Sequence, residues 1–151
     1  MSSSGYTPLT YRIAFAAMQG MGVDLARKLL DVVGSEEQFF AMSEKELRQL
    51  TRGRSKIYSD DYRRNILQQA LREESFVREH GIAVTYFADS TYPHRLLEAP
   101  DAPAMIYTLG KCDLESAHVV SVVNVCFADL ARFSFKSNFA FNNFFSNRDR
   151  D

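Results

Sequence analysis

The chain has 151 residues, with 18 lysines and arginines against 19 aspartates and glutamates and a formal net charge of −1. This balance excludes a globally basic nucleic-acid binder but allows a local cationic patch. The two cysteines, Cys112 and Cys126, are too few for a disulfide framework and fit a reducing compartment. Because the first residues lack the features of a secretion signal and no long uncharged apolar run occurs, we expect a cytoplasmic protein without a membrane partner.

The first half of the chain has the apolar spacing of a helical module that covers residues 11 to 80. Residues 1 to 10 are rich in Ser, Gly, Thr and Pro, which predicts a disordered N-terminus. A first helix is expected from about residue 13, and a second runs from about residue 25 until Gly34 ends it. Gly20-Met21-Gly22 separates the two helices.

Three further helices complete this module. Ser35 with Gln38, and Ser43 with Glu46, have the spacing of capping boxes and predict two short helices. A longer helix is expected from about residue 60 until Gly81 ends it, and acidic residues at its start suit the helix dipole. The side chains predicted to point inward from these helices are Phe39, Phe40, Leu47, Leu50, Ile66, Leu67, Ala70, Leu71 and Val77.

The hydrophobic period changes from 3.6 to 2 after residue 81. Residues 82 to 87 predict a strand, Pro93 favours the start of a short helix, and residues 104 to 107 predict a second strand. Residues 118 to 123 are almost continuously apolar, as in a strand that is buried on both faces of a parallel sheet. We therefore expect an α+α/β fold, with an α/β domain that begins at residues 82 to 123.

The composition changes after Val123. Residues 124 to 151 contain seven of the twelve Phe residues and neither Gly nor Pro. A buried strand of a doubly wound domain should lead into a glycine-containing turn and a helix. We favour a non-native or disordered tail, and the alternative is a Phe-rich terminal helix that packs on the sheet.

Two features are candidates for phosphate binding. Gly20-Met21-Gly22 lies between two amphipathic helices, where backbone and helix N-terminal N–H groups can contact a phosphate, or where a tight turn simply needs positive φ. The other is a concentration of basic residues with two nearby tyrosines, Tyr58 and Tyr62, which either stack on bases or pack on one another. Its candidate DNA-binding residues are Arg52, Arg54, Lys56, Arg63 and Arg64.

Sequence patterns that carry catalysis are missing. The chain has no H-E-x-x-H, G-x-S-x-G, paired C-x-x-C or G-x-x-x-x-G-K-[ST] motif. Cys112 and His118 have no third ligand at a useful spacing, so a metal site is not expected. We predict a protein that is not an enzyme and needs no cofactor.

Residues 11 to 123 resemble the DNA-processing protein A (DprA/Smf) family. The likeness rests on the glycine hairpin, on the helix that ends at His80-Gly81, and above all on a motif in the second half. Physically, this motif looks like architecture, because prolines fix φ and a tyrosine covers the edge of the sheet. Its residues are Tyr92, Pro93, Leu96, Pro100, Asp101, Ala102, Pro103, Tyr107 and Gly110.

The resemblance implies a SAM-like or helix-hairpin-helix-like domain followed by an extended Rossmann fold. It also implies a non-enzymatic protein that binds single-stranded DNA in natural transformation and recombination, assists loading of the RecA recombinase, and dimerises through the Rossmann domain. Family members continue the strand with Gly-Thr/Ser-Arg, whereas Asn124 follows Val123 here. We therefore expect a truncated, compromised chain without the family's dimer surface. The alternatives are a helical protein-interaction module and a fragment of a nucleotide-processing Rossmann enzyme.

Overall fold

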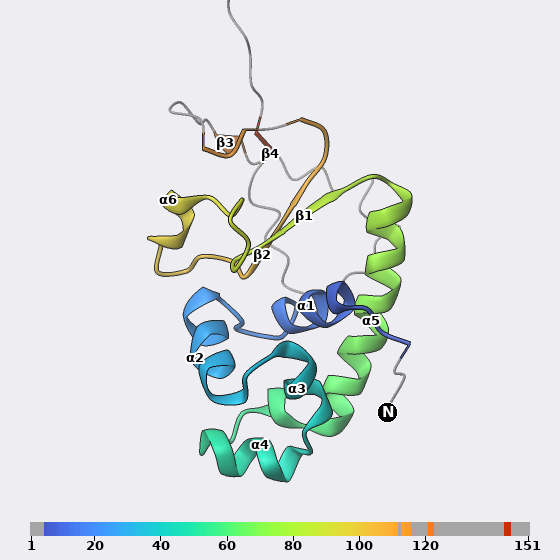
Figure 1. Cartoon of the computed structure of the whole chain (residues 1–151), viewed down its shortest axis with the longest axis vertical. Helices are drawn as coiled ribbons and strands as arrows, with labels where there is room; N and C mark the ends of the chain where they lie inside the picture. Colours follow the sequence, from blue (N-terminus) through green and yellow to red (C-terminus); the bar gives the residue numbers. More distant parts are fainter. Residues whose placement is uncertain (1–4, 112, 116–120, 123–143, 146–151) are drawn as a thin grey trace, which may run out of the picture.

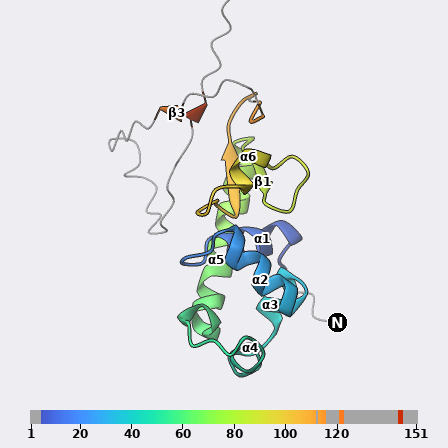
Figure 2. The ribbon, with the colours of Figure 1, turned by 90° about the vertical axis from the view of Figure 1, so that its left-hand side faces the viewer.

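The computed structural model describes residues 5–111, 113–115, 121–122 and 144–145, which form an α+β arrangement dominated by helices. Helix α5 runs along the molecule, with α3 and α4 near its first part and the strands β1 and β2 towards its end (Figures 1 and 2). Helix α1 packs further along α5, where its N-terminal residues reach Glu74. The helices are α1 (Pro8–Ala16), α2 (Val23–Val33), α3 (Glu36–Ala41), α4 (Glu44–Thr51), the 3-10 helix η1 (Lys56–Tyr58), α5 (Asp60–Glu79) and α6 (His94–Leu97).

Helix α1 begins earlier than the sequence predicts. The Thr7 and Thr10 side chains each accept from the other residue's backbone N–H, at 3.1 and 3.2 Å, and Pro8 occupies the first turn. Both hydroxyls also bond the Glu74 carboxylate on α5. The prediction of a disordered segment over residues 1 to 10 is therefore wrong from Thr7 onward, and residues 1–4 lie outside the described part of the chain.

The local signals for the other helices are confirmed. Gly34 ends α2 with a φ of +100°, and Ser43 and Glu46 form the full capping box of α4. Ser35 caps α3 by accepting from the N–H of Gln38, although the reciprocal half of a capping box is not formed. Helix α5 covers almost the whole predicted span and is followed by Gly81 at a φ of +62°.

The helices and the first sheet share one hydrophobic core. Phe39 and Leu47 are fully buried as predicted, whereas Leu71 is only partly buried and Leu50 is 46% exposed. Leu50 lies on the same face of α4 as Leu47, but it is in the last turn of this two-turn helix, where neighbouring elements no longer cover that face. The same core contains Tyr86, Met105 and Ile106 from the strands, so the expected boundary at residues 80 to 82 falls inside one core.

Both described strand pairs are antiparallel. Strand β1 (Ala83–Tyr86) pairs with β2 (Met105–Thr108), and β3 (Ser121–Val122) pairs with β4 (Phe144–Phe145). The parallel arrangement expected from residues 118 to 123 is therefore not seen in the described pairs. Most of that segment lies outside the described residues, and so do residues 124–151 apart from β4. A parallel partner needs a long crossover, whereas between β1 and β2 the only helix is the four-residue α6.

The prolines and tyrosine of the second half join this sheet to the helices. Tyr92 is 1% exposed, and its hydroxyl donates to the carbonyl of Pro103 at 2.6 Å. The carbonyl of Ala102 accepts from the N–H of Val23 at 3.0 Å, and Gly22 and Pro103 form an isolated antiparallel β-bridge. Burial raises the pKa of Tyr92 to about 12, an effect that the nearby positive charge of Arg27 opposes. These hydrogen bonds fix the first turn of α2 against the segment that precedes β2.

Candidate nucleic-acid interface

The fold holds the basic loop of residues 52 to 56 in a defined shape. Arg52 ends α4 in the left-handed conformation, with a φ of +53°, and the Gly53 N–H donates to the Thr51 hydroxyl at 3.2 Å. A Cβ on Gly53 would lie 2.5 Å from the ring of Tyr58, so only glycine allows this close approach. The side chains of Arg52, Arg54 and Lys56 are exposed. Three cations are thus presented from a loop that packs on the core.

The two tyrosines beside this loop have different surroundings. Tyr58 is 6% exposed, and its ring lies 6.4 Å from that of Phe39, so it belongs to the core. Tyr62 is half-buried, and its hydroxyl accepts from the N–H of Gln19 at 2.9 Å. The Lys56 ammonium lies 6.0 Å from the centroid of the Tyr62 ring. One side chain therefore contacts both the basic loop and the turn between α1 and α2.

The glycine hairpin uses its backbone donors within the chain. Gly20 has a φ of +75°, and the N–H groups of Met21 and Gly22 donate to the carbonyls of Met18 and Gly20. The Val23 N–H, at the start of α2, is bonded to a carbonyl in the second half of the chain. Asp24 adds a negative charge to the first turn of α2, which opposes an anionic ligand. The structure favours the tight-turn interpretation for Gly20, whereas Gly22 has a φ of −96° and lies where an added Cβ would be 3.3 Å from the carbonyl oxygen of Ala102. Phosphate binding at this turn would depend on side chains.

Arg63 does not belong to the exposed basic surface. It is 3% exposed, and its Nη1 donates to the carbonyls of Phe39 and Met42 at 2.6 and 2.7 Å. Its Nη2 forms an ion pair with Asp60, whose carboxylate also accepts from the backbone N–H of Glu44 at 3.0 Å. Burial lowers the pKa of Arg63, which the charges of Asp60 and Glu44 oppose, and the group stays protonated. Arg63 therefore joins α3, α4 and α5, and its assignment to DNA binding is withdrawn.

Arg64 remains on the surface. Its guanidinium lies 3.1 Å from the carboxylate of Asp61, and the two side chains are 70% and 85% exposed. Exposed ion pairs of this kind are weak and are screened by salt, so Arg64 can exchange Asp61 for a phosphate.

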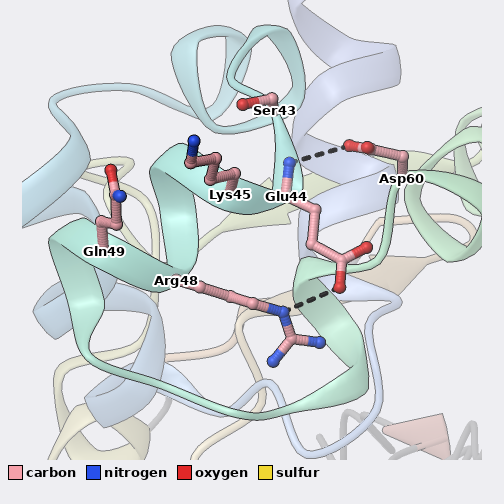
Figure 3. A pocket seen from close by; sticks show the side chains of 6 residues that line it. All are labelled: Ser43, Glu44, Lys45, Arg48, Gln49 and Asp60. Carbon is pink, nitrogen blue, oxygen red and sulfur yellow. Dashed lines mark hydrogen bonds and ion pairs between the residues drawn. The ribbon is translucent and has the colours of Figure 1, made fainter.

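A shallow hollow on α4 is a second polar feature (Figure 3). Within it the Arg48 Nε donates to Glu44 at 2.7 Å, and Asp60 occupies the other side of the Glu44 backbone. Carboxylates next to the cations make this surface unfavourable for a polyanion. The residues that line it are Ser43, Glu44, Lys45, Arg48, Gln49 and Asp60.

Other kinds of site find no support in the described part of the chain. No group of three or more His, Cys, Asp and Glu residues is placed to hold a metal ion there, and no helix there has the length and apolarity to cross a membrane. Comparisons with protein-family models, with curated proteins and with solved structures found no match.

Sequence reasoning missed two features of this surface. The hydrogen bond between Tyr62 and Gln19 joins residues 43 positions apart, so no local sequence pattern predicts it. The role of Arg63 had a partial signal, because Asp60 lies three residues before it, at the spacing of a helical ion pair. Its burial depends on where α3 ends, which the spacing does not reveal.

Proposed function

We propose that this chain is a DprA-like protein that binds single-stranded DNA without catalysing a reaction. In this proposal residues 11 to 80 correspond to the SAM-like or helix-hairpin-helix-like domain of that family, and the segment with Tyr92-Pro93 and Pro100-Asp101-Ala102-Pro103 corresponds to the start of its Rossmann-like domain. A cytoplasmic location, a role in natural transformation and recombination, and assistance to RecA are the biological part of the same proposal.

The observation that carries the proposal is the exposed basic loop. Arg52, Arg54 and Lys56 are presented by a loop that Gly53 and Tyr58 hold in place, so little backbone freedom is lost when they bind. Side chains of this type bind phosphates and carry no sequence information. We therefore expect binding that is independent of sequence and that weakens as salt concentration rises.

The magnitude of the salt effect follows from the number of cations. If three cations each neutralise one phosphate of a single strand, the logarithm of the affinity falls with the logarithm of salt concentration with a slope of about −2. Arg64 would make this slope steeper by up to about 0.7. Neither the hairpin amides nor Arg63 should contribute.

The test is fluorescence anisotropy of a labelled oligothymidylate titrated with the full chain over a series of salt concentrations. Lys56→Gln should weaken binding and reduce the salt slope by about 0.7. Lys45→Gln is the matched control, because it removes the same charge from an exposed position beside the carboxylates of the hollow. Equal losses in the two variants, or no binding by the unmodified chain at low salt, would contradict the proposal.

A further inference from the structure

Tyr62 is placed to do more than support the basic loop. We propose that its ring stacks on a nucleobase and that this contact makes the surface prefer single strands to duplexes. The inference rests on the proposed function, since it assigns a specificity-determining residue to the same surface. It starts from three observations: the partial exposure of the residue, the hydrogen bond to its hydroxyl, and the Lys56 ammonium over its ring.

Of the two tyrosines that adjoin the basic loop, Tyr62 is partly exposed and Tyr58 is buried. The ring of Tyr58 is enclosed between Phe39 and the backbone of Gly53. Tyr62 projects from the first turn of α5, three residues after the N-cap Ser59 and next to the exposed loop. Aromatic rings beside a cationic track are the usual stacking platforms for single-stranded nucleic acid, because every base has a π face.

The hydrogen bond from Gln19 prepares the ring for this contact. It joins the Tyr62 hydroxyl to the turn between α1 and α2 at 2.9 Å, which limits rotation of the side chain. A ring that is already fixed loses little entropy when a base stacks on it.

Lys56 relates the ring to the phosphate backbone. Its ammonium lies 6.0 Å from the ring centroid, a contact that is weak at an exposed position. When a strand binds, Lys56 can move to a phosphate while the adjacent base takes its place over the ring. Bases of a duplex are paired and stacked on one another, so they cannot reach the ring without being unstacked.

The test compares three labelled probes of roughly twenty units, which exceed common single-strand site sizes. They are an oligothymidylate, a DNA duplex, and an abasic oligomer that has the phosphates but no bases. Tyr62→Leu should weaken binding to the oligothymidylate about tenfold and leave the other two probes within about twofold. Tyr62→Phe retains the ring and should keep most of the affinity for the oligothymidylate.

The possible results distinguish a failure of the stacking role of Tyr62 from a failure of the proposed DNA binding. Equal weakening of all three probes by Tyr62→Leu would mean that Tyr62 only anchors the turn and Lys56, and an unchanged affinity would mean that it makes no contact. Either result overturns the stacking role while the Lys56→Gln test still stands. If the unmodified chain binds none of the probes at low salt, the proposed function itself fails. Thermal unfolding of both variants verifies that they are folded.

Discussion

Replacement of Arg63 by alanine tests whether this residue supports the fold or binds DNA. The substitution removes the donors to the carbonyls of Phe39 and Met42, and it removes the cation that neutralises Asp60. The hydrogen bond to the Phe39 carbonyl is buried, so water can replace the guanidinium only in part. We therefore expect Arg63→Ala to damage the fold strongly.

The size of the effect follows from the hydrogen bonds and the ion pair that the guanidinium makes. Hydrogen bonds to a charged group contribute about 1.5–3 kcal/mol each, and Arg63 makes two of them to backbone carbonyls. The ion pair adds less, because the Asp60 side chain is 52% exposed and stays solvated without its partner. Because these contributions overlap, we expect a loss of about 3–5 kcal/mol in the free energy of unfolding. For a domain of this size that lowers Tm by more than about 10 °C. The loss is a large part of the stability of a typical domain.

The assay is urea unfolding followed by circular dichroism, with Arg64→Ala as the matched control. Arg64 is the next residue of α5 and carries the same charge, but its ion pair with Asp61 is exposed, so its loss should change stability by less than about 1 kcal/mol. If both variants unfold at the same urea concentration while Arg63→Ala alone loses DNA binding, the structural role assigned to Arg63 is refuted.

Three further substitutions test the fold and the hairpin. Burial raises the pKa of Glu74, but hydrogen bonds from Thr10 and Thr7 and the charge of Arg78 outweigh it and lower the pKa. The stabilisation is therefore present above the ordinary pKa and is lost as pH falls through the lowered value. Glu74→Gln should cost about 1–3 kcal/mol at pH 7 in urea unfolding, and a deficit that does not shrink as pH falls below the ordinary pKa would contradict this. Burial raises the pKa of Glu73, an effect that a hydrogen bond from Tyr107 opposes, so ionisation of Glu73 lowers the stability of the fold as pH rises through the raised value. Glu73→Gln should therefore increase the urea midpoint at pH 7 and not at about pH 4. A decrease at pH 7 would refute the reasoning. A Cβ added at Gly20 has no neighbour within 4 Å, but the new alanine must adopt positive φ. Gly20→Ala should therefore lower the free energy of unfolding by about 1–2 kcal/mol and leave DNA affinity unchanged. Weaker DNA binding by a folded variant, measured by anisotropy, would support phosphate binding at the hairpin.

Much of the fold could be predicted because it depends on neighbouring residues. Ser43 with Glu46, and Gly34 after an amphipathic stretch, specify helix ends through groups within four residues of each other. The start of α1 was missed although its signals are local, because the Ser, Gly, Thr and Pro content of residues 1 to 10 indicated disorder and the Thr7–Thr10 capping box with Pro8 was overlooked. The bond from Thr7 to Glu74, 67 residues away, could not be predicted. Leu50 was wrongly placed inside because periodicity gives the apolar face of a helix but not how much of that face its neighbours cover.

The sequence by itself determined the order of the helices and first strands, the caps that separate them, and the position of a cationic loop at residues 52 to 56. Only the tertiary structure decided what individual side chains do there. It buried Arg63 against a carbonyl 24 residues away, bonded the Val23 N–H at the start of α2 to the carbonyl of Ala102, and placed Tyr62 between Gln19 and Lys56. The physical reason is that caps and turns are short-range hydrogen bonds, whereas burial and charge pairing depend on which distant segments pack together.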